Sequence, residues 1–122
     1  MFICGSIMPK EENIELSGYR AMWLFACFDL PVDSKEARKQ YTRFRNSLIK
    51  QGFTMLQFSV YARFCASEES GEIHRKKVRA ALPPDGQVRI ISITDKQFGK
   101  MEVYYGQNRV PTEDPPMQMS FF

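Results

Sequence analysis

A continuous apolar run constrains the fold of this chain more than any other feature of its sequence. Residues 22–28 read Met-Trp-Leu-Phe-Ala-Cys-Phe, and Asp29, Leu30 and Pro31 end the run. A strand with one face in water alternates apolar and polar residues, so a run without alternation predicts a strand buried on both faces. Such a strand lies in the middle of a sheet. The rest of the chain must then supply strands on both sides of it.

A basic helix is predicted directly after this strand. Pro31 ends the strand, and Asp33 with Glu36 supplies a box-like helix start. The helix should cover residues 34–51, with Gly52 as the residue that stops it. Apolar residues recur at intervals of four, three and four along it, which gives one buried stripe. The stripe consists of Ala37, Tyr41, Phe44 and Leu48.

The remaining segments complete an α+β pattern. Residues 53–65 are β-rich but long for one strand, so we expect two strands divided near residues 57–59, or one strand with a bulge. A second helix is expected over residues 68–82 with Ser67 as its cap. The order is strand, helix, strand, strand, helix, strand, which is typical of a ferredoxin-like βαββαβ sandwich with an additional C-terminal strand. The last two strands are expected at residues 88–94 and 101–105.

Length and composition bound the class of protein. The chain has 122 residues, 43% of them apolar and 25% charged, which is typical of one globular domain. Three Cys without a CxxC pair and a single His argue against a zinc cage or a disulfide framework. No apolar run reaches the length of a membrane span. These counts indicate a reduced, cytosolic protein without a membrane segment.

Three parts are expected along the chain. Residues 1–15 form a variable N-terminal lead-in, residues 16–106 form the domain, and residues 107–122 form an extended C-terminal tail. The tail contains three Pro within ten residues, which disfavours a helix or a central strand.

One carboxylate stands where functional groups gather. Asp29 follows the buried strand directly and precedes a loop that Pro31 begins, and functional side chains concentrate at such positions. A turn-capping role is the common alternative for a strand-end Asp. No other carboxylate is an obvious partner, so a Mg²⁺ site would need waters, carbonyls or a second subunit. A two-fold axis would supply a second Asp29.

Basic residues form the second candidate site. Between residues 34 and 50 there are six Lys or Arg and one Glu. Two basic helices on one side of a sheet would suit phosphate contacts, whereas a solvated helix face is the alternative. The candidate nucleic-acid contacts are Lys35, Arg38, Lys39, Arg43, Arg45, Arg63, Arg75, Lys76 and Arg79.

The sequence resembles a known family across about residues 16–106. The family is CRISPR-associated protein 2, the small dimeric subunit of the spacer-acquisition machinery, in the version found beside Cas9-type effectors. No single motif is specific, but their combination is. The matching segments are residues 16–20, 23–25, 28–31, 52–61, 82–84, Gly86 and 93–99.

This resemblance implies a ferredoxin-like homodimer whose last strand crosses to the partner's sheet. It implies that Asp29 is the catalytic and metal-binding carboxylate of a Mg²⁺-dependent (or Mn²⁺-dependent) endonuclease acting on RNA or DNA. It also implies a bridging role between two dimers of the integrase, CRISPR-associated protein 1, on duplex DNA.

Two functions stay open on the sequence. A metal-dependent nuclease requires two Asp29 side chains close together, whereas an architectural DNA-binding adaptor requires only the dimer and the basic helices. The tail from Gln107 is expected to dock onto the integrase, and a disordered tail is the alternative. Docking is suggested by an alternation with polar residues, as in an added edge strand, at Met117, Met119, Phe121 and Phe122.

Overall fold

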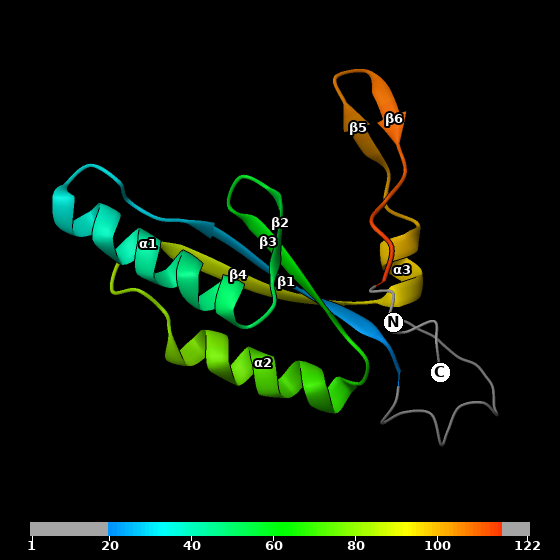
Figure 1. Ribbon diagram of the computed structural model, residues 1–122, viewed down its shortest axis with the longest axis horizontal. Coiled ribbons are helices and arrows are strands. Elements are labelled where there is room, and N and C mark those ends of the chain that lie inside the picture. The colour runs from blue at the N-terminus through cyan, green and yellow to red at the C-terminus, as the bar shows by residue number, and fades with distance from the viewer. Residues whose placement is uncertain (1–19, 116–122) are drawn as a thin grey trace.

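The structure is a computed structural model that describes residues 20–115. A sheet with two long helices forms the body, and a short helix and a hairpin follow it (Figure 1). The body consists of β1 (Met22–Asp29), α1 (Lys35–Lys50), β2 (Thr54–Gln57), β3 (Val60–Cys65), α2 (Glu68–Ala80) and β4 (Gln87–Thr94). The later elements are α3 (Asp95–Gly99), β5 (Val103–Tyr105) and β6 (Asn108–Val110).

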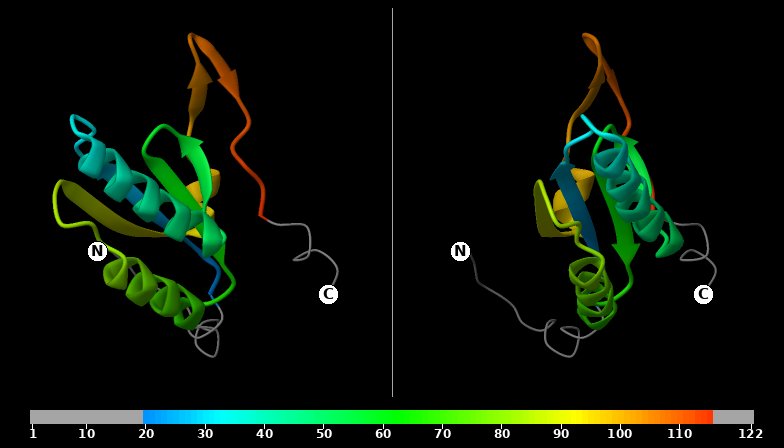
Figure 2. Two further views of the ribbon diagram at one scale, coloured as in Figure 1. Left: turned by 60° about the vertical axis from the view of Figure 1, so that its left-hand side comes forward. Right: turned by 90° about the vertical axis from the view of Figure 1, so that its left-hand side faces the viewer.

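The sheet is antiparallel with the strand order β2-β3-β1-β4. β1 is hydrogen-bonded on both sides, and Trp23 lies opposite Phe64 of β3 and Ile93 of β4. Both long helices lie on the same face of the sheet (Figure 2). The central position of the apolar run and the βαββαβ order are therefore confirmed, and the topology is consistent with a ferredoxin-like fold.

The main core lies between the sheet and the two helices. Even-numbered residues of β1 face it, because successive strand residues point to opposite faces. Leu24 of β1 packs there with Phe44 and Leu48 of α1, Tyr61 of β3 and Val78 of α2, and each of these side chains is at most 1% exposed.

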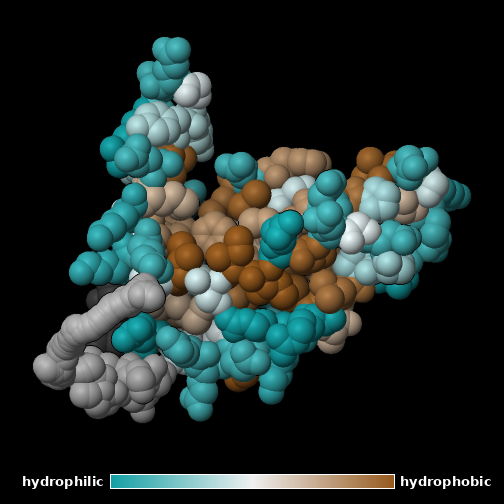
Figure 3. Space-filling view, turned by 180° about the vertical axis from the view of Figure 1, so that it is seen from behind, coloured by the Kyte–Doolittle hydropathy of each residue, from teal (hydrophilic) through white to brown (hydrophobic). Residues whose placement is uncertain are grey.

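The opposite face of the sheet is covered only at one end. There Trp23 stacks on Phe98 of α3, with ring centroids 3.9 Å apart. Further along this face the side chains of Phe25, Cys27 and Val60 are only half-buried, and Ile91 is 43% exposed. Hydrophobic atoms gather over the middle of the sheet on this side (Figure 3). We call this surface, from Phe25 to Asp29 on β1 and across to β3 and β4, the open face.

The N-terminal cap of α1 differs from the predicted one. Ser34, not Asp33, caps the helix, and its Oγ accepts a hydrogen bond from the Ala37 amide at 3.0 Å. Asp33 stands one residue too early to accept it. Gly52 follows the helix with φ +92°, so its role as the stop residue is confirmed. α2 has its predicted cap, Ser67, but ends at Ala80 instead of residue 82.

The split of the long β segment is also confirmed. β2 ends at Gln57 and β3 begins at Val60, and Ser59 between them has φ 63°. The register shifts between Met55 and Gln57, which marks a β-bulge.

The segment after β4 differs most from the prediction. The predicted short strand at residues 101–105 is present as β5, but α3 and β6 were not predicted, and β5 pairs with β6 in a hairpin separate from the main sheet. This hairpin projects from the body (Figure 1). β6 falls in the first residues of the predicted tail. The lead-in at residues 1–15 and the rest of the tail from residue 116 lie outside the described residues.

A glycine at position 86 should be required for stability, because the loop before β4 passes close to the end of β1 there. Its φ is +91°, and a Cβ there would come within 2.7 Å of the Asp29 carbonyl oxygen and of Leu30. Replacing Gly86 with Ala should lower the free energy of unfolding by about 1–3 kcal/mol, measured by urea denaturation. Gly99→Ala is the control, since nothing lies within 4 Å of its would-be Cβ. Equal stability of the two variants would contradict this prediction.

Candidate active site and nucleic-acid interface

Asp29 lies at the carboxyl end of the central strand, on the open face. It pairs with Gln87 at the start of β4, so the ends of both strands meet there. The side chain is exposed. Its backbone is fixed from three directions, by β4, by the close approach of Gly86 and by the Phe28 amide, which donates to the Ser59 carbonyl at 3.1 Å. A solvent-facing carboxylate is thus held on a rigid element.

A small hollow of about 210 Å³ surrounds Asp29. It is lined by Cys27, Phe28, Asp29, Gln87 and Arg89. Burial raises the pKa of the Cys27 thiol above its ordinary value. That thiol is therefore protonated at neutral pH, and neither nucleophilic attack nor metal binding by a thiolate is favoured. Asp29 is the one carboxylate in the lining.

The residues present fit a hard metal ion only in part. Within residues 20–115, no three His, Cys, Asp or Glu side chains stand close enough together to hold a metal. One exposed carboxylate can still supply one oxygen ligand, because Mg²⁺ keeps several waters and is often bound by one or two carboxylates plus a substrate phosphate. Since no second carboxylate lines the hollow among residues 20–115, another copy of the chain could supply one.

Four of the predicted nucleic-acid contacts form one surface on α1. Their spacing of three and four residues places them on the same side of the helix, away from the core residues Phe44 and Leu48. Thr42 lies among them, and Asn46 follows them toward the C-terminal end of the helix. We call this exposed surface the basic stripe, and its cations are Lys35, Arg38, Lys39 and Arg43.

Two predicted contacts instead hold the fold together. The Arg63 guanidinium donates to the carbonyls of Gln51 at 2.7 Å and Phe64 at 2.6 Å. Arg45 Nε donates to the Tyr61 hydroxyl at 2.9 Å. Both side chains are half-buried, and their hydrogen bonds join α1 to β3.

The cations of α2 are divided between structure and solvent. Glu72 pairs with Arg75 at 3.1 Å and with Arg79 at 3.4 Å, and Arg75 also donates to the Ser92 hydroxyl of β4. Lys76 is exposed. The structure thus gathers the α1 cations into one surface but does not add Arg63 or the α2 arginines to it.

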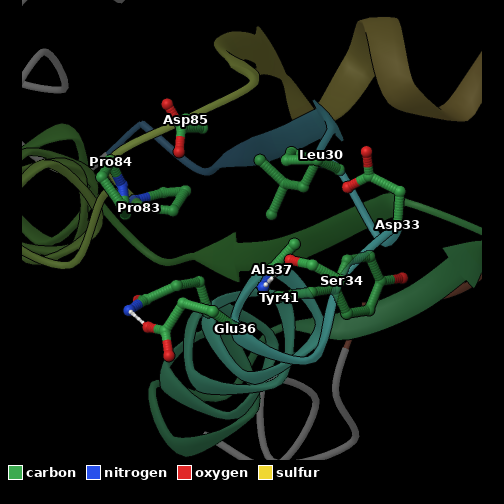
Figure 4. Close-up of a pocket in the computed structure, with 11 residues that line it drawn as sticks. Leu30, Asp33, Ser34, Glu36, Ala37, Tyr41, Pro83, Pro84 and Asp85 are labelled. Atoms are coloured by element: carbon green, nitrogen blue, oxygen red, sulfur yellow. Dashed lines mark hydrogen bonds between the residues drawn. The ribbon is translucent and has the colours of Figure 1, made fainter.

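A separate cleft of about 340 Å³ lies at the N-terminal end of α1 (Figure 4). Its floor is apolar, with Leu30, Tyr41 and prolines. Asp33, Glu36 and Asp85 give it a negative rim. This cleft was not predicted from the sequence, since its two walls are about 50 residues apart in the chain. Its charge suits a nucleic acid poorly.

Further residues near Asp29 were not predicted. Arg89 and Gln87 line the hollow, but only the β1–β4 register reveals this.

His74, the one His of the chain, lies away from this hollow, and its Nδ1 is 3.3 Å from the side-chain oxygen of Gln51. Burial, followed by the nearby charges of Arg63 and Lys77, lowers the pKa of His74.

An antiparallel sheet with two helices on one face places the chain among small α+β proteins with a ferredoxin-like fold. A carboxylate at the end of the central strand marks its candidate site. The chain belongs to the family of CRISPR associated protein Cas2, whose profile matches residues 22–101. This match confirms the family resemblance found in the sequence.

Curated relatives of similar length support the assignment. A protein of Flavobacterium psychrophilum is 44% identical over 94% of this chain and 100% of its own. One of Parvibaculum lavamentivorans is 52% identical over 83% of this chain and 100% of its own. A third, of Paracidovorax avenae, is 45% identical over 88% of this chain and 99% of its own. Each of the three is named CRISPR-associated endoribonuclease Cas2.

Replacing Arg63 should cost stability, whereas replacing Arg43 should not. Arg63→Met would leave the carbonyls of Gln51 and Phe64 without their donor, and we expect a loss of about 1–3 kcal/mol in the free energy of unfolding. Arg43→Met, on the exposed stripe, should change it by less than about 0.5 kcal/mol. Urea denaturation of both variants tests this. A stable Arg63→Met variant would show that these hydrogen bonds contribute little.

Proposed function

We propose that this protein is a homodimeric, Mg²⁺-dependent endonuclease of CRISPR spacer acquisition that also binds duplex DNA between integrase dimers. The single observation that carries the nuclease proposal is the exposed Asp29 at the end of a rigid central strand, on a sheet face that stays open. The relatives' name, endoribonuclease, supports RNA as the substrate that is cut. The protein acts in the cytoplasm.

The open face supports the homodimer. Its partly covered apolar residues, Phe25, Val60 and Ile91, would be removed from water by a second copy. Closed dimers with a two-fold axis are the commonest assemblies of such chains. Because Asp29 lies on the same face, a dimer across it brings two Asp29 side chains into one interface.

Asp29 and its symmetry copy would together hold the metal ion. The ion supplies Lewis-acid chemistry, polarising a phosphate oxygen and lowering the pKa of a bound water. The chain's own part is to fix the carboxylate through the β1–β4 pairing and to keep the neighbouring Cys27 thiol protonated. Without a cation, two close carboxylates repel each other.

The basic stripe supports duplex binding through phosphates. Lys35, Lys39 and Arg43 are exposed on one side of one helix, and the guanidinium of Arg38 also donates to the Val32 carbonyl at 3.1 Å. Contacts of this kind are insensitive to sequence and sensitive to salt.

A purely architectural adaptor is the second candidate function. It is favoured by one observation, namely that Asp29 is the one carboxylate of its hollow within the described residues. In an adaptor the dimer and the basic stripe would act alone, and Asp29 would be structural. Both candidates require the integrase as partner, so a pull-down with the integrase subunit, with and without duplex DNA, tests what they share.

A charged residue on the open face should break the dimer. Ile91→Glu introduces a carboxylate into a surface that we expect to be dry, so light scattering should show a folded monomer at micromolar concentration. The matched control is Ile73→Glu on α2, where Ile73 is 53% exposed and away from the open face. A dimer that survives Ile91→Glu would place the interface elsewhere.

Neutralising the basic stripe should reduce the salt dependence of duplex binding. Changing Lys35, Lys39 and Arg43 together to Gln should lower the slope of log affinity against log salt by about 0.9 for each phosphate that the helix no longer neutralises. The same removal of charge at Lys96, Lys100 and Arg109 serves as the control. An equal effect in both triple variants would assign binding to net charge alone.

Removing the carboxylate should abolish cleavage. Asp29→Asn keeps the size of the side chain and removes its charge, so cleavage of an RNA oligonucleotide in Mg²⁺ or Mn²⁺ should be lost while the dimer persists. A chelator should have the same effect on the wild type. Equal cleavage by both highly purified proteins would exclude catalysis by Asp29 and leave the adaptor role.

A further inference from the structure

An arginine shares the hollow of Asp29 but takes part in no interaction described above. Arg89 lies on β4 directly opposite Cys27, one pleat from the Asp29–Gln87 pair. All four side chains line the same space of about 210 Å³. Arg89 therefore lies on the open face and lines the same hollow as the Asp29 carboxylate.

The surroundings of Arg89 do not explain the charge. On one side its neighbours on the open face are apolar, with Ile91 next on the same strand and Phe25 opposite Ile91, and on the other side Gln87 and Asp29 line the hollow. Among the residues that the structure describes, the ion pairs join Glu72 to arginines of α2, and no hydrogen bond from the Arg89 side chain occurs. Arg89 is exposed. An exposed guanidinium that has no partner within residues 20–115 keeps its five N–H donors available to a ligand.

A phosphodiester is the ligand whose chemistry suits this arrangement. Asp29 alone would repel a phosphate, because both groups are negative. A guanidinium beside it offsets that repulsion and can bind two phosphate oxygens at once in a fixed fork. It also stabilises the negative charge that develops on the equatorial oxygens during phosphoryl transfer.

We propose that Arg89 contacts the scissile phosphate beside Asp29 and is a second catalytic residue of the site. This assignment rests on the proposed nuclease function. Arg89 donates hydrogen bonds and transfers no proton, since a guanidinium stays protonated in proteins. The opposing view is structural: Arg89 pairs with a carboxylate of the second copy and holds the dimer.

The test compares Arg89→Gln and Arg89→Lys with the matched control Lys100→Gln, an exposed cation of the segment after α3. Light scattering first establishes whether each variant is a dimer. Cleavage of an RNA oligonucleotide in Mn²⁺ then gives kcat and KM. Binding of the same oligonucleotide in chelator, followed by fluorescence anisotropy, gives a Kd that does not depend on the metal.

We expect Arg89→Gln to remain a dimer and to lose about 100-fold in kcat/KM, most of it in kcat. Arg89→Lys should recover part of this loss, because it restores a point charge without the fork. Lys100→Gln should stay within about twofold of the wild type. In chelator, Arg89→Gln should bind the oligonucleotide more weakly than Lys100→Gln does.

Two results would overturn the proposal. The first is normal cleavage by a dimeric Arg89→Gln when Asp29→Asn is inactive, and the second is dissociation of the dimer in Arg89→Gln. If wild type and Asp29→Asn are both inactive, the nuclease function itself fails. In that case, oligonucleotide binding in chelator still tests whether Arg89 contacts phosphate. A weaker Kd in Arg89→Gln supports the contact, and an unchanged Kd overturns it.

Discussion

The pairing of β1 on both of its edges is the constraint on which the rest of the structure depends. With a neighbour on each side, this strand cannot tilt, and its side chains must divide strictly between the two faces. Leu24 and its even-numbered neighbours fill the core beneath the helices, whereas Phe25, Cys27 and Asp29 are left on the open face. The helix-covered core therefore supports the strand that presents the carboxylate, and the apolar run serves both purposes at once.

Regular, local signals in the sequence were sufficient to predict the body of the fold. The unbroken apolar run predicted a central strand, the apolar stripe of the first helix predicted its buried side, and Gly52 predicted its end. Short elements were missed because their signals are weak. The missed elements are α3, which has five residues although Thr94 and Gln97 form a capping box at its start, and β6, which has three residues; β5 was predicted. For α3 the tertiary contact that fixes it is the stacking of Phe98 on Trp23, which its own sequence does not reveal.

Site residues were predictable where their position along one strand or helix determines their role. They were not predictable where the role depends on contacts with residues distant in the chain. Asp29 and the stripe on α1 follow from sequence order and helical spacing. The roles of Arg63 and Arg45 depend on carbonyl and hydroxyl groups that are distant in the chain, and a count of basic residues cannot separate bonded from available cations. Arg89 was missed for the same reason, since only the β4 register places it beside Asp29.

The two sides of α1 give the helix a charge boundary. Glu36 lies on both surfaces, at the end of the basic stripe and on the rim of the acidic cleft. Beyond Lys35, at the N-terminal end of α1, Asp33 and Asp85 on the rim of the cleft would repel a polyanion that lies along Lys39 and Arg43. In the proposed DNA-binding role, this repulsion would set an edge to the row of bound phosphates on each protomer. A two-fold axis would repeat this edge on the second protomer. The distance between the two edges would then fix the length of nucleic acid that one dimer can hold.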